Sequence, residues 1–388
     1  MIYDLKKLKD YVYNRSELGP MPDDIEEYLA YLSIGGPAIL AYRCYLNMFP
    51  KSQNRKYNYR LAATQTAFGI ISLFNKEETE RLLSYWFNNI DGVNYIKAVI
   101  KYCVYGDLQA VLEEYCHLLK TAGYDIEKKP GSFSIVDHLI EVLGFKTTKI
   151  NCVFKEHKTL FETENKYKNS YLRCHYAVPL GNQKQTDDAG VQRIGNIRDA
   201  FNSPFRPFML NSTSIGQEGL DFHWYCRRVI HWNIPGNPIE IEQREGRIDR
   251  YKSLLIRKRI AADLAQEEFR GNGDIWEKMF AIANDKTKNN RHSDLIPYWY
   301  YPDTNEIARD IKIERFVLAL PLSKDIDKYK NALKIISLYR LAFGQPRQEE
   351  FLNNLIHKEL SDDQIDELYN TLVINLCPLT NNDLKKNR

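Results

Sequence analysis

The sequence lacks the marks of a secreted or membrane-spanning protein. Its seven cysteines are scattered and include no C-x-x-C pair, so we expect reduced core thiols and no metal site. The first fifteen residues, MIYDLKKLKDYVYNR, contain no apolar segment of the kind found in secretory signals. No run of about 18 apolar residues occurs, so no membrane span is predicted. These absences predict a soluble, cytoplasmic protein with no membrane partner.

The sequence also has little excess charge of either sign. Charged residues make up 27% of the chain, and the net charge is only +3. This balance neither requires nor excludes a polyanionic partner, so local clustering has to decide that question. With 388 residues and 44% hydrophobic residues, the chain is long enough for two or three domains with cores of their own.

Residues 1–130 are predicted to be helical. Amphipathic segments with apolar residues at i, i+3, i+4 and i+7 occur at 23–34, 38–49, 78–90 and 106–123. The sequence Gly35-Gly36-Pro37 predicts a break between the first two, and Gly123 is expected just beyond the end of the last. The adjacent carboxylates Glu113 and Glu114 are interpreted as a solvated helix face. We place a domain boundary near Pro130.

The pattern changes between residues 131 and 262. Strands are predicted at 149–154, 171–180, 207–211 and 229–232, and helices at 135–143 and 191–201. Apolar strands joined by helical crossovers favour an α/β domain with a mostly parallel sheet covered on both sides. Residues 263–388 are predicted to form a helical extension. Its helices are expected at 262–269, 274–285, 328–343 and 362–376, and the aromatic patch at 292–303 is interpreted as an interface or core.

A polar stretch rich in hydroxyl groups follows the predicted strand at 207–211. Within Ser212-Thr213-Ser214-Ile215-Gly216-Gln217-Glu218-Gly219-Leu220-Asp221, the glycines allow the backbone to approach a phosphate or sugar closely. Serine and threonine hydroxyls donate to phosphate oxygens. Asp221 is suited to accept a hydrogen bond from a ribose hydroxyl.

A charged stretch, Gln243-Arg244-Glu245-Gly246-Arg247-Ile248-Asp249-Arg250, follows about twenty residues later. If it is helical, Arg247 and Arg250 lie on one face with Gln243 one turn earlier. Two guanidinium groups on one face suit a nucleotide γ-phosphate that another domain supplies.

Together the two stretches resemble motifs V and VI of superfamily 2 helicases. The second matches the Q-x-x-G-R-x-x-R pattern at every fixed position, and the first is similar to the T-S-x-G-x-x-G-x-D/N form. The spacing, with I-H-W-N-I-P between them, is most similar to the SWI/SNF-type and bacterial RNA-polymerase-associated translocases. The motifs cover about a tenth of the chain. The resemblance implies that residues 131–262 form a second RecA-like lobe.

The resemblance also implies roles for individual residues. Arg247 and Arg250 would be arginine fingers. Gln243, Gly246 and Gly219 would lie near the nucleotide, Gly219 at the lobe interface, and Asp221 would lie near the ribose. Thr213, Ser214 and Gly216 would approach the nucleic-acid backbone. The basic run at 227–259, which begins with Arg227 and Arg228, is either a solvated face or a further contact with DNA.

The sequence departs from the family in its missing first-lobe motifs. A working motor needs a phosphate-binding loop, G-x-x-x-x-G-K-[ST], and an acidic D-E-x-H/D motif that holds Mg²⁺. Neither occurs in this chain. The resemblance therefore implies that ATP and Mg²⁺ are bound mainly by a first lobe on a separate polypeptide or on a segment missing from this sequence. By itself the chain is expected to bind ATP poorly and to be inactive.

Two functional hypotheses follow. The first is the C-terminal motor lobe of an ATP-dependent helicase or double-stranded-DNA translocase, in a setting such as phage defence or DNA repair. The second is an ATP-independent subunit, derived from a helicase, that binds nucleic acid or docks on a complex. Two simpler interpretations remain open for the same residues: arginines that pair with nearby acids on a surface helix, and glycines that are ordinary turn residues. His175, His223 and His231 lack the spacing of a ligand set and are interpreted as structural.

Overall fold

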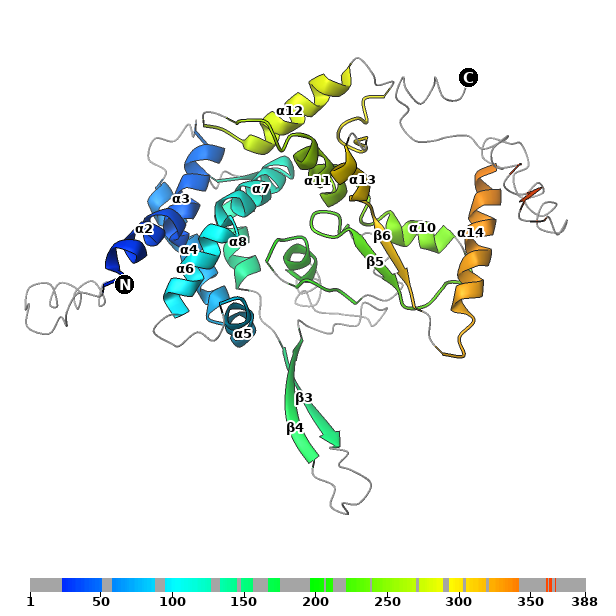
Figure 1. Cartoon of the computed structure of the whole chain (residues 1–388), viewed down its shortest axis with the longest axis horizontal. Helices are drawn as coiled ribbons and strands as arrows, with labels where there is room; N and C mark the ends of the chain where they lie inside the picture. The colour runs from blue at the N-terminus through cyan, green and yellow to red at the C-terminus, as the bar shows by residue number, and fades with distance from the viewer. Residues whose placement is uncertain are drawn as a thin grey trace, which may run out of the picture. The chain divides into compact units, whose positions relative to one another are not determined.

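The computed structural model divides into two compact units, Met1–Gly144 and Phe145–Arg388 (Figure 1). The structure describes residues 23–50, 58–87, 95–126, 133–144, 148–155, 167–174, 196–205, 207–211, 221–237, 239–269, 272–288, 293–302, 305–318, 321–341, 361, 363, 364 and 367. No helix in these ranges is both long and apolar enough to cross a membrane.

The first unit is built from helices. Its elements are α2 (Ile25–Gly35), α3 (Pro37–Met48), α4 (Tyr59–Phe74), α5 (Glu77–Trp86), α6 (Tyr95–Tyr105), α7 (Leu108–Thr121) and α8 (Ile135–Leu143), with a short parallel pair formed by β1 (Tyr124–Asp125) and β2 (Phe133–Ser134). The helices predicted at 23–34, 38–49, 78–90 and 106–123 are confirmed within one to four residues at each end. Helix α8, predicted at 135–143, packs against α4 and α7 of this unit.

Local sequence explains where these helices begin and end. Gly36 separates α2 from α3, and Pro37 occupies the first turn of α3, where a missing amide hydrogen costs nothing. The side chain of Asn58 caps α4 by accepting from the amide of Leu61. Gly123 follows α7 with a φ of 91°, a conformation that favours glycine. Both predicted breaks are therefore confirmed.

The core of the first unit also contains polar groups. Cys44 of α3 and Cys116 of α7 are buried with their Sγ atoms 3.8 Å apart, which agrees with the prediction of core thiols. The interpretation of Glu113 as solvated is wrong, because its side chain is buried and accepts hydrogen bonds from Asn47 and Gln109 at 2.9 Å. A buried carboxylate is tolerated when donors surround it, and these donors come from two helices.

The second unit contains a two-stranded antiparallel ladder rather than the start of a parallel sheet. Strands β3 (Thr148–Lys155) and β4 (Tyr167–Cys174) pair along their full length, with Thr148 opposite Cys174 (Figure 1). The prediction that these strands belong to a parallel sheet is wrong. Residues 149–152 alternate polar and apolar, as in many antiparallel strands, whereas Cys152, Val153 and Phe154 form an apolar run. The connection is also too short for a usual helical crossover.

The other two strands of the second unit within the described ranges form a parallel pair. Strand β5 (Arg228–His231), predicted at 229–232, pairs with β6 (Glu314–Val317). No strand was predicted at β6, so the helical extension expected from residue 263 onward is wrong at this point. Helix α10 (Ile239–Glu245) packs beside this pair with α14 (Asp325–Leu341), through a cluster formed by Ile234, Ile241, Ala332 and Ile336.

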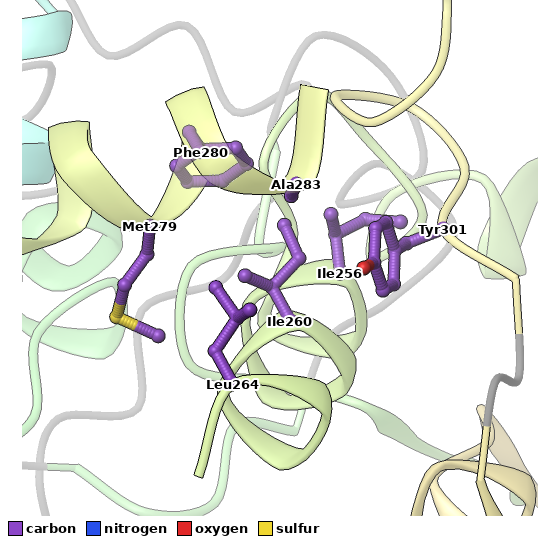
Figure 2. Close-up of a cluster of buried hydrophobic side chains, with 7 residues drawn as sticks. All are labelled: Ile256, Ile260, Leu264, Met279, Phe280, Ala283 and Tyr301. Carbon is purple, nitrogen blue, oxygen red and sulfur yellow. The ribbon is translucent and has the colours of Figure 1, made fainter. Parts of the chain in front are cut away.

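A second apolar cluster joins α11 (Leu254–Asp263) to α12 (Ile275–Lys288) and to the aromatic segment after it. Figure 2 shows its members, Ile256, Ile260, Leu264, Met279, Phe280, Ala283 and Tyr301. The interpretation of the aromatic patch as core is confirmed for Tyr301, which is buried. The helix predicted at 262–269 is wrong, because α11 begins earlier and ends at Asp263. Helix α13 (Glu306–Asp310) follows the patch.

Two other predicted elements differ from what the structure shows. Residues 207–211 form no strand, and the side chains of Phe208 and Met209 are exposed. Pro207 has no amide hydrogen to contribute to a sheet, which weakens a strand at that position. The helix predicted at 191–201 is confirmed for residues 196–201, and residues 191–195 lie outside the described ranges. Residues 175–180 of the strand predicted at 171–180 also lie outside them.

Candidate functional site

The structure brings Arg247 and Arg250 together around a single carboxylate. An Nη atom of Arg247 lies 3.8 Å from Oδ1 of Asp221, and an Nη atom of Arg250 lies 3.3 Å from the same oxygen. Both arginines follow α10 in a turn, because Gly246 ends the helix. Two guanidinium groups share one carboxylate, so the cluster keeps excess positive charge. Both distances exceed those of short charge-assisted hydrogen bonds, so the pairs are loose.

Backbone contacts fix Asp221 beside this turn. The amide of the Asn202 side chain donates to the carbonyl of Asp221 at 2.7 Å, and the amide of Phe222 donates to the carbonyl of Arg247 at 2.9 Å. The rings of Phe201 and Phe222 meet edge to face at 5.6 Å. Asp221 and Phe222 therefore join the end of the helix at 196–201 to the turn after α10.

Each arginine also has an unused donor. The Nε atoms of Arg247 and Arg250 are buried and have no hydrogen-bond partner among the described residues. A buried donor without an acceptor is costly, and it marks a place where an acceptor fits. The arrangement is therefore suited to an anion with several oxygens, such as a phosphate group.

His223 lies near Asp221, Arg250 and Arg257, whose charges act on its imidazole. Burial lowers the pKa of its imidazole to about 4, the nearby Asp221 opposes that shift, and Arg257 and Arg250 add to it. Arg257 itself is fully buried and donates to the carbonyls of Lys252 and Trp224. The interpretation of His223 as a structural histidine agrees with these surroundings.

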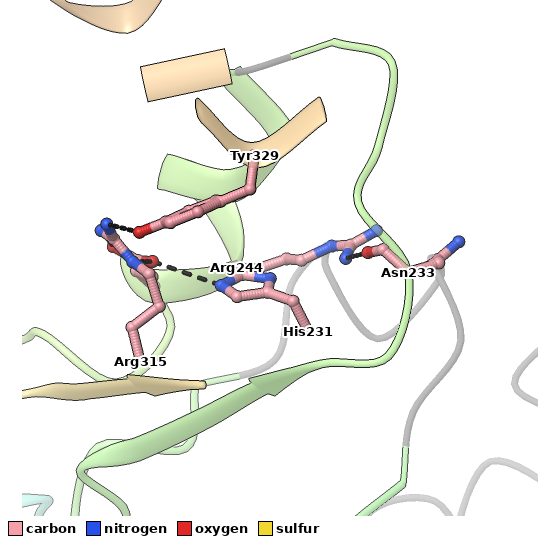
Figure 3. Close-up of polar contacts among 6 residues, drawn as sticks. His231, Asn233, Arg244, Arg315 and Tyr329 are labelled. Carbon is pink, nitrogen blue, oxygen red and sulfur yellow. Dashed lines mark hydrogen bonds and ion pairs between the residues drawn. The ribbon is translucent and has the colours of Figure 1, made fainter. Parts of the chain in front are cut away.

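A network of charges anchors the end of α10. Glu245 accepts two hydrogen bonds from Arg315 of β6 and one, at 3.3 Å, from the ring of His231 at the end of β5. The third guanidinium nitrogen of Arg315 donates to the hydroxyl of Tyr329 on α14 at 2.7 Å. Figure 3 shows Arg315 directed toward the Tyr329 hydroxyl, with His231 between the strand and the helix. These contacts lower the pKa of the Glu245 carboxyl despite its burial, which alone would raise it.

Arg244, the neighbour of Glu245, contacts the loop after β5 instead of strand β6. Its guanidinium donates to the carbonyl of Asn233 at 3.0 Å (Figure 3). It also lies 3.9 Å from the carboxylate of Glu240 one turn earlier. The loop after β5 is thereby joined to α10, so α10 is held on two sides.

Lys252 lies at the end of the segment that begins at Glu245 and carries Arg247 and Arg250. Its ammonium lies over three aromatic rings, at 4.6 Å from the centroid of Phe280, 5.6 Å from Tyr251 and 5.9 Å from Tyr298. Cations are attracted to the faces of aromatic rings, more strongly when they are shielded from water. The Lys252 amide also donates to the carbonyl of Tyr298 at 2.8 Å. The backbone at Lys252 has a φ of 51°, which is rare for a residue with a side chain.

Arg227 and Arg228 join the two parallel strands to each other. Arg228 donates to the carboxylate of Glu314 at 2.6 Å, and Arg227 pairs with the other oxygen of that carboxylate. Arg227 also donates to the carbonyl of Lys312 at 3.0 Å. Part of the basic run is therefore engaged within the protein, and its contact with DNA stays a prediction.

The remaining predicted residues are placed as follows. Gln243 lies on an exposed position of α10, one turn before Arg247. A methyl group on Gly246 would lie 3.2 Å from the carbonyl oxygen of Glu242, so a larger residue is crowded there. Asp221 contacts the arginines, and its role at a ribose stays a prediction. Thr213, Ser214, Gly216 and Gly219 lie outside the described residues, as does His175.

Comparison with known proteins supports one assignment. Residues 135–252 match the family model described as the helicase conserved C-terminal domain, which is a RecA-like α/β fold. No curated protein and no solved structure matches the chain. The match supports a helicase-type C-terminal lobe in this region and an α/β fold class. It contains Asp221, Arg247 and Arg250, and it ends at Lys252.

Several residues that shape the site carry no recognisable signal in the sequence. Glu245 occupies a variable position of the motif, and Glu314, Arg315 and Tyr329 lie in the region predicted as a helical extension. Contacts such as that between Glu245 and Arg315 join residues 70 positions apart, so no local sequence pattern predicts them. Phe316 and Val317, two residue types enriched in strands, are the sequence signal for β6.

Proposed function

We propose that this chain is the C-terminal motor lobe of an ATP-dependent superfamily 2 DNA helicase or translocase of the SWI/SNF-like type. Arg247 and Arg250 act as arginine fingers on ATP that a separate first lobe holds. The observation that carries the proposal is their convergence on Asp221 within the region that matches a helicase C-terminal domain. That first lobe belongs to a separate polypeptide or to a segment outside this sequence.

The geometry of the pairs suits such a role. Partly exposed ion pairs contribute only about 0 to 1 kcal/mol, so Asp221 holds the arginines without binding them tightly. A phosphate offers several charged acceptors and binds guanidinium groups more strongly than one loosely placed carboxylate. Arrival of the γ-phosphate would therefore draw the arginines away from Asp221. Positive charge fixed near the transferring phosphoryl group stabilises the transition state.

The described residues of the site fit the phosphate side of the nucleotide. The unused Nε donors of Arg247 and Arg250 suit phosphate oxygens. No group of three or more His, Cys, Asp or Glu side chains suited to a metal occurs within the described ranges. We assign Mg²⁺ mainly to the first lobe, because the acidic D-E-x-H/D motif that holds it does not occur in this sequence. Gln243, Gly246 and Gly219 border the nucleotide in this proposal, and Thr213, Ser214, Gly216, Arg227 and Arg228 face double-stranded DNA.

The test is ATP hydrolysis by the assembled motor. This chain is mixed with the polypeptide that carries the phosphate-binding loop, and phosphate release is measured with and without double-stranded DNA. Arg250→Ala and Arg247→Ala should each lower kcat on the order of a thousandfold, with little change in the KM for ATP. Arg309→Ala, at an exposed arginine of α13, is the matched control and should leave kcat unchanged.

Other outcomes would contradict the proposal. If Arg250→Ala and Arg247→Ala hydrolyse ATP as the unmodified chain does, the arginines are not fingers. If the chain binds DNA with a steep dependence on salt, unchanged by ATP and by Arg250→Ala, the ATP-independent subunit is favoured instead.

A further inference from the structure

The segment that carries the two arginines is held at both ends by residues from far along the chain. At its start, the Glu245 carboxylate is held by His231 and Arg315. The Glu245 carbonyl in turn accepts from the amides of Ile248 at 3.0 Å and Asp249 at 3.2 Å. The side chain and backbone of one residue therefore connect β6 to the turn between Arg247 and Arg250.

At its end, the segment is held by the aromatic rings around Lys252. Phe280 belongs to α12, and Tyr298 to the aromatic segment that follows it. The Tyr298 ring stacks on that of Phe280 at 5.6 Å and on that of Tyr251 at 5.7 Å, so the rings support one another. The carbonyl of Lys252 also accepts from the buried Arg257 at 2.7 Å.

Most of the residues that hold this segment lie C-terminal to the region that matches the helicase C-terminal domain. The match ends at Lys252, whereas Phe280, Tyr298, Arg315 and Tyr329 all come later in the chain. The region after residue 263 is therefore part of the lobe rather than an attached extension.

We propose that Arg315 is a positioning residue that sets the place of Arg247 and Arg250, with Tyr329 orienting Arg315. The inference rests on the proposed function, because positioning matters only if the arginines act on a nucleotide. Arg315 touches neither arginine and acts through Glu245. Its charged, two-pronged contact is suited to this, since paired donors on a carboxylate fix direction as well as distance.

The first measurement does not need ATP. Amide hydrogen exchange is followed by mass spectrometry in the unmodified chain, Arg315→Ala and Arg309→Ala. Arg315→Ala should speed exchange in the peptide covering residues 246–251 on the order of tenfold, because the turn opens locally when Glu245 loses its partner. Exchange in α12, which supports the other end of the segment through Phe280 and not through Glu245, should stay unchanged. Arg309→Ala should match the unmodified chain throughout.

The second measurement uses the assembled motor. Arg315→Ala should lower kcat by about tenfold to a hundredfold with the KM for ATP unchanged, and Arg315→Lys should recover part of that loss. If Arg315 acts through the fingers, adding Arg315→Ala to Arg250→Ala should lower kcat little further. Should Arg315→Ala fail to fold, Tyr329→Phe removes one acceptor and keeps the ring, and it should give a smaller change of the same kind.

Three results separate the possibilities. Unchanged exchange at residues 246–251 in Arg315→Ala would overturn the inference. Faster exchange spread equally over α12 would also overturn it, because Arg315 would then support the lobe in general. If exchange changes as expected but the unmodified chain and its partner hydrolyse no ATP, the proposed function fails while the placement of the turn by Arg315 stands.

Discussion

At the scale of single residues, the site combines loose and tight contacts. Arg247 and Arg250 meet Asp221 at 3.8 and 3.3 Å, whereas the neighbouring Arg257 is fully buried and donates to backbone carbonyls. The loosely held arginines have room to change partners, and the buried one does not. This contrast identifies which arginines of the basic run suit a ligand and which hold the fold.

His223 leads to a prediction about pH. Its pKa is about 4 in the folded chain and 6.5 without the fold, so between these values the unfolded state binds more protons. Stability is therefore full above about pH 6.5 and is lost as the pH falls toward 4. Allowing for partial exposure, the loss should be about 1–2 kcal/mol.

The measurement is urea unfolding of the chain and of His223→Asn at several pH values. Between pH 7 and pH 5 the unmodified chain should lose more stability than the variant, because asparagine does not titrate. Between pH 8 and pH 7 the two should change alike. Parallel curves over the whole range would contradict the assignment of a depressed pKa to His223.

At the scale of elements, the second unit depends on contacts between its early and late parts. Strand β5 pairs with β6, and α10 packs with α14 through Ile241 and Ile336. The cluster of α11 and α12 lies next along the chain and supports the aromatic rings around Lys252 (Figure 2). Packing between α11 and α12 thus supports the turn that carries Arg247 and Arg250.

Ile260 tests this cluster. It is fully buried on α11, so Ile260→Ala removes apolar contacts and leaves a cavity, at a cost of about 2–4 kcal/mol. Ile307→Ala on α13 is the matched control, because Ile307 is 66% exposed and its loss should change stability by less than about 0.5 kcal/mol. The free energies of unfolding are compared in urea. Equal losses for the two variants would show that the cluster is not a core.

At the scale of the whole molecule, we propose that the chain supplies one side of a nucleotide site. Its sequence has no phosphate-binding loop and no acidic D-E-x-H/D motif, and its described residues offer no metal cluster. The chain by itself should therefore hydrolyse ATP no faster than a blank, as measured by phosphate release with Mg²⁺ and double-stranded DNA. Mg²⁺-dependent hydrolysis that survives Arg250→Ala and stops after a substitution elsewhere in the chain would contradict this expectation.

The sequence by itself determined the features that depend on local order. Helix periodicity placed α3, α7, α8 and α12, because each buries one face at a regular spacing. The order of Gln243, Gly246, Arg247 and Arg250 predicted a helicase-type lobe, which the match at residues 135–252 supports. The apolar run Cys152, Val153 and Phe154 suggests a strand buried on both faces, as in a parallel sheet, but β3 pairs antiparallel with β4.

Only the tertiary structure decided which distant residues complete the site. Asp221 meets the arginines because backbone bonds bring Phe222 to Arg247, and Arg315 meets Glu245 because β6 pairs with β5. Such contacts join residues tens of positions apart, and their partners are set by the packing of elements rather than by neighbours in sequence. Local patterns therefore identified the arginines, and the fold selected the residues that hold them.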